Sequence, residues 1–162
     1  MKCANCAHVM TKSLTRHHYK ECGLNNVYLD GVVMWKCRAC DESELEIQDN
    51  EVLHQVIAKA IAEKKSRLKP EEIRFLRVHL GFSGVDFAKT ISVKPETVSR
   101  WENDPEHEMS LSNEKFLRML VLAKMKPFTD YETLQNVTKK SPKSTARMNF
   151  ATTKTGWESR AA

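Results

Sequence analysis

Four cysteines of this chain are spaced as a metal site requires. Cys3 and Cys6 form one Cys-x-x-Cys pair near the N-terminus, and Cys37 and Cys40 form a second pair further along. Each pair presents two thiolates on one tight turn, and two such pairs complete the tetrahedral coordination of Zn²⁺. Because four protein thiolates leave no open position on the ion, the sequence predicts a structural zinc site without catalysis at the metal.

Disulfide bonding and redox chemistry agree less well with this cysteine spacing than metal binding does. In a chain without an apolar leader segment, this spacing indicates metal binding more readily than disulfides. A redox-active pair is the rival interpretation, but it accounts for only one motif and lacks a thioredoxin-like βαβ context. The fifth cysteine, Cys22, is interpreted as a bystander thiol. His8, His17 and His18 are alternative ligands that the four thiolates make unnecessary.

A second group of residues, within 83–102, is typical of a helix-turn-helix. That motif needs a small residue where its two helices touch, a turn between them, and apolar residues at fixed offsets. The residues that meet these needs are Phe87, Ala88, Ile91, Val93, Val98 and Trp101. The pattern predicts two short helices, at about 84–90 and 95–103, with Pro95 in the first turn of the second. The competing interpretation is a small helical bundle with a solvated polar face.

The second of these helices presents polar side chains away from its apolar positions, namely Lys94, Glu96, Thr97, Ser99 and Arg100. In a helix-turn-helix the N-terminal part of this helix enters the major groove of DNA. Arg100 has the length and the paired donors to bridge the two acceptors of a guanine. We therefore expect these five residues to be the DNA contacts, with Arg100 as the main base-reading residue.

The charge of the chain, +5 in total, is unevenly distributed. Residues 70–125 carry eight basic and nine acidic residues, so the DNA-binding segment is near neutral by itself. DNA affinity depends on neutralising phosphates. The expected supplement is the basic cluster Lys64, Lys65, Arg67 and Lys69, together with the basic C-terminal segment.

The helices and strands that must position these residues are predicted from the spacing of apolar residues and from turn and capping residues. Asp30-Gly31, within 27–36, predicts a tight hairpin turn between two short strands. Apolar spacing and capping residues predict further helices at about 50–65, 70–81, 112–124 and 129–139. Residues beyond 141 are rich in Ser, Thr and Lys and are expected to be disordered. The expected fold is therefore mainly α, with a small N-terminal zinc-bound β module and a helical C-terminal helix-turn-helix domain.

The expected domain boundaries follow the same observations. They are a zinc-binding module at 1–48, a helical linker at 49–69, a helix-turn-helix domain at 70–125 and an extension at 126–162. No apolar run is long enough to span a membrane, and no secretory signal precedes the first cysteine pair. The expected location is therefore the cytoplasm.

The chain also resembles a known family. Residues 72–77 (Glu-Ile-Arg-Phe-Leu-Arg), Phe87-Ala88 and 97–102 (Thr-Val-Ser-Arg-Trp-Glu) resemble the Cro/cI-type (XRE) helix-turn-helix. Preceded by the cysteine pairs, which look like a YgiT-type zinc finger, they resemble the MqsA-type antitoxins over about residues 1–125. Three positions depart from that pattern. Ser92 replaces a turn glycine, Lys94 replaces the usual Ser or Thr cap, and Asp104 replaces a glycine.

The resemblance implies a bacterial, cytoplasmic antitoxin of a type II toxin–antitoxin pair. Its zinc module would hold a cognate toxin, usually an mRNA interferase, and its homodimer would repress the operon by binding a palindromic operator. The alternative is a stand-alone helix-turn-helix regulator whose zinc module is structural or senses metal or redox state. An enzyme is not expected, because the sequence has no nucleophile–base pattern and no phosphate loop.

The extension at 126–162 goes beyond the resemblance. One interpretation is a solvated basic segment that contacts DNA phosphates. The other is a linear segment whose aromatic residues, Tyr131, Phe150 and Trp157, are recognised by a chaperone or protease. The operator, the toxin and the roles of Cys22 and of this extension are not fixed by the sequence.

Overall fold

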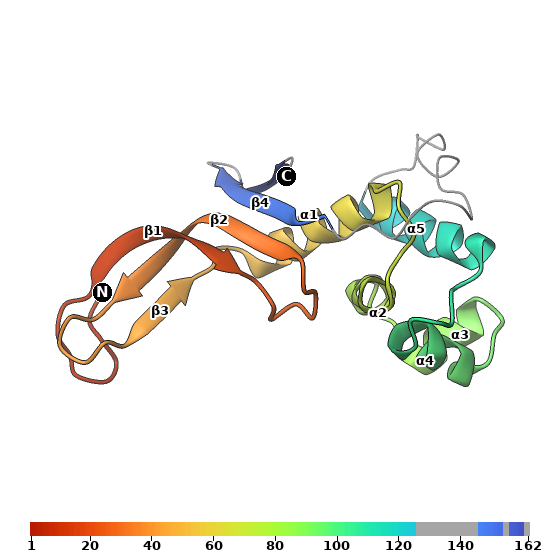
Figure 1. Ribbon diagram of the computed structural model, residues 1–162, viewed down its shortest axis with the longest axis horizontal. Helices are drawn as coiled ribbons and strands as arrows, with labels where there is room; N and C mark the ends of the chain where they lie inside the picture. The colour runs from red at the N-terminus through yellow and green to blue at the C-terminus, as the bar shows by residue number, and fades with distance from the viewer. Residues whose placement is uncertain (126–145, 154–155, 161–162) are drawn as a thin grey trace. The chain divides into compact units, whose positions relative to one another are not determined.

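The computed structural model of the chain describes residues 1–125, 146–153 and 156–160. The chain divides into two compact units (Figure 1). Unit 1 consists of residues 1–20, 25–53 and 146–162, and unit 2 consists of residues 21–24 and 54–145. One division between the units therefore falls between residues 53 and 54, and residues 146–162 belong to the same unit as the N-terminal residues. The expected helix at 129–139 lies outside the described residues.

The elements occur in a simple order along the chain. The strands are β1 (Thr11–His18), β2 (Val27–Lys36), β3 (Ser43–Glu46), β4 (Met148–Thr153) and β5 (Gly156–Arg160). The helices are α1 (Asn50–Glu63), α2 (Pro70–His79), α3 (Gly84–Thr90), α4 (Pro95–Asn103) and α5 (Leu111–Met125). None of these helices is long and apolar enough to cross a membrane.

The expectation of a mainly α protein is wrong. The described residues form a five-stranded mixed sheet in the order β1-β2-β4-β5, with β3 also paired to β2, beside the five helices. The sheet is therefore a major part of unit 1, not a small module around the two cysteine pairs. Polar strands such as β1 escaped prediction because most of their side chains are exposed and carry little hydrophobic alternation.

Strand β2 is one long strand where the sequence predicts a hairpin. Gly31 has a positive φ of 76°, as Asp-Gly implies, but the chain continues instead of reversing. The register of β1 on β2 shifts between Thr15 and Arg16, so Gly31 lies at a β-bulge. A bulge uses the same left-handed conformation as a tight turn, which is why the dipeptide alone does not distinguish them.

The C-terminal residues form a hairpin, β4–β5, where the sequence predicts disorder. Strand β4 pairs in parallel with the first half of β2, which places Phe150 opposite Leu29, and both side chains are fully buried. The Trp157 indole N–H donates to the Gln48 carbonyl at 2.9 Å, and a Cβ atom at Gly156 would lie 3.4 Å from Val52 Cγ1. Composition misled here because a few large apolar residues, placed on one face, bury enough area to order a polar segment.

The sheet of unit 1 has one buried and one exposed face. Val27, Leu29 and Val32 on β2 are buried. Successive side chains of a strand point to opposite faces, so Tyr28 and its cross-strand neighbours Arg16 and His18 lie on the other face. That face carries mostly exposed or half-exposed residues on β1 and β2.

The helical expectations for residues 50–125 are confirmed closely. Helix α1 has Asp49 at its start, whose carboxylate accepts the Val52 N–H at 3.2 Å. The α1 residues within unit 2 that are fully buried are Ile57, Ala58, Ile61 and Ala62. Helix α2 begins at Pro70, and the Glu72 carboxylate accepts the Lys69 N–H at 2.7 Å. Apolar residues of α1, α2 and α5 thus build the core that supports the helix-turn-helix.

A network of buried charges joins these helices. The Arg118 side chain is fully buried on α5 and donates to the carbonyls of Ala62 at 2.9 Å, Lys64 at 2.6 Å and Ser66 at 2.6 Å. It thereby satisfies carbonyl groups at and beyond the C-terminal end of α1. Glu114, one turn earlier, accepts from Arg118 at 2.8 Å and compensates its charge. Burial lowers the pKa of Arg118, and Glu114 opposes that shift.

Candidate metal centre and nucleic-acid interface

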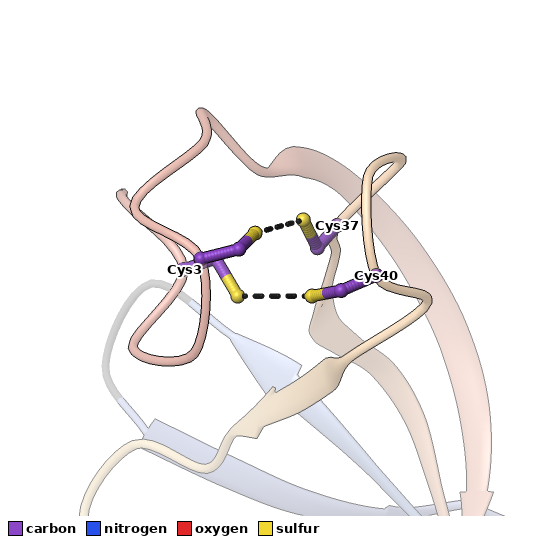
Figure 2. A group of neighbouring side chains, drawn as sticks. Cys3, Cys37 and Cys40 are labelled. Carbon is purple, nitrogen blue, oxygen red and sulfur yellow. Dashed lines mark hydrogen bonds between the residues drawn. The ribbon is translucent and has the colours of Figure 1, made fainter.

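Two loops bring the four cysteines together. Cys3 and Cys6 lie in the N-terminal loop, where the Ala7 N–H bonds to the Cys3 carbonyl at 2.9 Å and Ala7 has a positive φ of 60°. Cys37 and Cys40 lie in the loop between β2 and β3. Figure 2 shows this second loop facing Cys3, with the sulfur atoms directed toward one another. The structure thus assembles the whole predicted ligand set.

The sulfur geometry fits a metal ion. The Sγ atoms of Cys3 and Cys40 are 3.5 Å apart, those of Cys6 and Cys37 are 3.4 Å apart, and all four lie within 4.8 Å of one another. A tetrahedral zinc site with Zn–S bonds of about 2.3 Å places its sulfurs about 3.8 Å apart. A disulfide needs about 2.05 Å. The group could therefore hold a metal ion.

The thiols of this group have divergent pKa values. Backbone N–H groups of Ala39 and Cys40 lower the pKa of Cys37 to about 6, although burial opposes them. The His8 backbone lowers the pKa of Cys6, but bonds with Cys40 and Cys37 and burial outweigh it and raise that pKa to about 12. The pKa of Cys40 is also raised, since bonds with Cys3 and Cys37 and burial outweigh the lowering by Glu42 and Cys6. One thiolate is thus stabilised by the loop itself.

The alternative ligands lie outside this group. The sulfur cluster of the described residues contains the four paired cysteines and no histidine. His8 Nδ1 lies 3.1 Å from the Cys6 carbonyl, and the His18 Nε2–H donates to the Asn25 carbonyl at 2.9 Å. Cys22 is half-buried and belongs to unit 2, and burial raises its pKa. The four-thiolate set is therefore sufficient without them.

Helices α3 and α4 form the expected helix-turn-helix, and its apolar contacts are buried. Phe87 and Ala88 on α3 are fully buried, and Val98 and Trp101 on α4 are nearly so. Ser92 in the turn has a positive φ of 56°. That position therefore has the left-handed conformation for which glycine is usual, and the serine is strained there.

The polar face of α4 is open. Lys94, Glu96, Ser99 and Arg100 are exposed and Thr97 is half-exposed. Lys94 makes no side-chain bond to the start of α4, as its replacement of a Ser or Thr cap implies. The Asn103 side chain donates to the Ser99 carbonyl at 2.8 Å. Four of the five predicted DNA contacts lie on α4 and Lys94 directly precedes it, and the structure leaves their side chains accessible.

A buried ion pair fixes α4 from beneath, and sequence reasoning did not identify it. Arg77 on α2 donates to the Glu102 carboxylate at 2.5 and 2.9 Å and to the Phe82 carbonyl at 2.6 Å. Glu102 raises the pKa of Arg77, although burial opposes that shift. Periodicity places each residue on its helix but does not indicate that two charges are buried against each other.

Two residues of the expected basic cluster at 64–69 form ion pairs inside unit 2. Lys64 pairs with Glu72 at 2.6 Å, and burial lowers its pKa. Arg67 is buried and pairs with Glu114 at 2.6 Å and with the Met109 carbonyl at 2.6 Å. Their charges are therefore paired within unit 2, where they join the segment after α1 to α2 and α5. The exposed cations in the described part of unit 2 are Lys59, Lys65, Arg74, Lys89, Lys94, Arg100 and Lys124.

Comparison with family models, with curated proteins and with solved structures gave no match. Two structural features of the chain remain as candidate sites. They are a four-cysteine group that could hold a metal ion and an α3–α4 pair with an exposed polar face.

Proposed function

We propose that this protein binds double-stranded DNA sequence-specifically by inserting α4 into the major groove. The observation that carries the proposal is the division of α4 into two faces. Val98 and Trp101 are buried against unit 2, whereas Lys94, Glu96 and Arg100 are exposed. A buried ion pair holds the helix in place, so its outward side chains are presented from a rigid support.

Base reading is assigned to Arg100 and phosphate contact to its neighbours. Arg100 is exposed and makes no ion pair within the described part of the chain. Its paired donors therefore remain available for a guanine, a contact that contributes about 1–3 kcal/mol of discrimination. Glu96 can accept from cytosine N4, and Thr97 and Ser99 suit bases or phosphates.

Selection from a pool of randomised DNA duplexes tests this proposal. We expect the full chain to enrich a short motif that contains guanine, as two half-sites if it binds as a dimer. The small helical bundle with a solvated face predicts no enrichment above the pool, and that result would exclude the proposal.

We propose that this protein represses transcription from its operator as a homodimer. Helix α5 buries Leu117 and Val121, yet four of its other large apolar residues are only half-buried: Phe116, Met119, Leu120 and Leu122. A second copy packed on these residues would pair two recognition helices for a palindromic operator. Sedimentation of the full chain gives the mass, and a Leu120→Glu variant should shift it toward the monomer.

We further propose that the protein is an antitoxin whose metal-bound unit holds a toxin, such as an mRNA interferase. Met1 and Val9, which flank the cysteine loop of unit 1, are 47% and 73% exposed. Large apolar side chains left in water beside a rigid metal site favour a protein partner. The metal itself would be structural Zn²⁺, since four thiolates close its coordination shell.

Co-expression with the product of a neighbouring short gene tests the antitoxin proposal. Growth arrest by that product, relieved by this chain but not by a Val9→Glu variant, supports it. DNA binding without rescue or complex formation would favour the alternative, a stand-alone regulator with a structural or sensing metal site.

A further inference from the structure

A group of cationic side chains surrounds one aromatic ring on the exposed face of the unit 1 sheet. The Arg16 guanidinium lies 5.0 Å from the centre of the Tyr28 ring, and that of Arg147 lies 5.2 Å from the same point. The His18 ring stacks on Tyr28 with centroids 4.4 Å apart. We call these four residues the Tyr28 cluster. Three chain segments supply it, since Arg147 comes from the residue preceding β4.

The cluster has a fixed framework and an uncompensated charge. Arg16 pairs with Asp30 at 3.2 Å and bonds to the Asn149 amide oxygen. Arg147 is exposed and makes no ion pair within the described residues. One carboxylate therefore faces two guanidinium groups, and an anion at this point would meet a preorganised positive site.

A second cation–aromatic pair lies on the same face. Lys12 Nζ is 5.7 Å from the centre of the Trp35 ring, and the register pairs Lys12 with Trp35 as it pairs His18 with Tyr28. Lys12 and Arg16 are separated by roughly 13 Å of strand at about 3.3 Å per residue, so they would contact different phosphates. Leu14, between them, is 71% exposed and offers an apolar surface to a base.

Basic and acidic residues are unevenly distributed around these two cation–aromatic pairs. Residues 2–20 contain basic residues and no acidic ones. The acidic side chains Glu44 and Glu46 lie on β3, on the opposite side of β2 from β1, and Glu46 accepts from the Trp35 indole N–H at 2.8 Å. A polyanion would therefore be attracted along β1 and kept from β3.

From this arrangement we propose that the exposed face of the unit 1 sheet binds single-stranded nucleic acid along β1. Lys12, Arg16 and Arg147 contact phosphates, and bases stack on the guanidinium planes that cover Tyr28 and on the Trp35 ring. Basic grooves interleaved with aromatic rings on a sheet are the chemistry by which single strands are bound without strict sequence preference. This activity is separate from duplex binding by α4.

Fluorescence anisotropy of the full chain with a labelled single-stranded oligouridine tests the proposal, with oligothymidine as a second probe. The test variant is the double substitution Lys12→Ala/Arg147→Ala, which spares Arg16 because that residue also bonds to Asn149 and Asp30. The matched control is Lys36→Ala/Lys59→Ala. It removes the same charge from exposed positions, and Lys36 points to the opposite face of the sheet from Lys12.

The test variant should weaken binding about tenfold and reduce the slope of log K against log salt by about 1.4, as two lost phosphate contacts require. The control should bind within about twofold of the unmodified chain, and all three should retain the same circular dichroism and metal content. Equal weakening by both doubles, or no binding of either probe, would overturn the proposal. Displacement by polyglutamate at equal charge concentration would do so too, because it would assign the face to acidic proteins.

The duplex-binding proposal fails independently of this one. An Arg100→Ala variant should lose selected duplex sites and keep oligouridine binding, and the Lys12→Ala/Arg147→Ala variant should do the reverse. Loss of both activities in either variant would contradict two separate surfaces.

Discussion

Arg77 and Glu102 form a two-bond ion pair between α2 and α4, with both side chains nearly buried. The position of α4 therefore depends on a charge pair, not on apolar contacts alone. Arg77 also donates to the Phe82 carbonyl, so the pair fixes the segment that leads into α3 as well.

Replacing Glu102 by Gln should therefore destabilise unit 2. The substitution leaves the Arg77 charge buried without its partner, which costs about 3 kcal/mol. Urea unfolding followed by circular dichroism at 222 nm measures the change. The exposed Glu106 provides the matched control, and Glu106→Gln should alter the free energy of unfolding by less than about 0.5 kcal/mol. Equal stabilities of the two variants would contradict a structural role for the pair.

Arg118 should be intolerant even of lysine. Its guanidinium donates to backbone carbonyls in the last turn of α1 and just beyond it, and also to Glu114, and a lysine ammonium cannot match that planar fork. Arg118→Lys should cost about 2–4 kcal/mol in the same urea experiment. Lys124, exposed on the same helix, serves as the comparison, and Lys124→Arg should be neutral because arginine can keep the single exposed bond to the His79 carbonyl. A neutral Arg118→Lys would show that the carbonyls find other donors.

Removing the C-terminal hairpin should destabilise unit 1. Phe150 is fully buried opposite Leu29, so Phe150→Ala leaves a cavity that costs about 3–4 kcal/mol. Glu158→Ala on the same hairpin removes an exposed side chain and should have little effect. In a Trp101→Phe background, the fluorescence of Trp35 reports the unfolding of unit 1 in every variant, the truncated chain included. If truncation after residue 145 left that transition unchanged, the hairpin would not be part of the unit.

Metal affinity should fall steeply with acid. Ligand thiols must be deprotonated, and the raised pKa values of Cys6 and Cys40 keep both protonated at pH 7. Zinc binding near pH 7 should thus release at least two protons and weaken about 100-fold per unit of falling pH. Below about pH 6 Cys37 also becomes protonated in the metal-free protein, which adds a third proton and steepens the dependence.

Competition with a chromophoric chelator at several pH values measures this slope. Cys22→Ser should leave both affinity and slope unchanged, since Cys22 lies outside the ligand group. Cys37→Ser should abolish tight binding. An affinity independent of pH would contradict coordination by thiols that bind protons at neutral pH.

The sequence predicts the helical unit well and the sheet poorly, for physical reasons. Helices α3 and α4 follow from strong local signals, Pro95 at the start of α4 and apolar residues at helical spacing. The four cysteines follow from spacing alone. The parallel pairing of β4 with β2 joins residues more than a hundred positions apart, and no local pattern encodes such a contact.

The candidate sites divide in the same way. The residues on α4 could be predicted because one helix carries them all. The Tyr28 cluster could not, since Arg16, Tyr28 and Arg147 meet only after β1, β2 and β4 have paired. The basic cluster at 64–69 was misjudged because charge counts do not distinguish an exposed lysine from Lys64 or Arg67, which are paired within the fold.

The affinity of the Arg100→Ala variant for a duplex selected by the full chain tests the central claim most directly. The proposal predicts a loss of about 5- to 150-fold, equivalent to 1–3 kcal/mol, on the selected duplex. It also predicts no further loss when the guanine that Arg100 reads is changed. Arg160→Ala, which removes the same charge from unit 1, should bind within about twofold of the unmodified chain. Equal affinity of Arg100→Ala and the unmodified chain for every duplex would contradict recognition of DNA by α4.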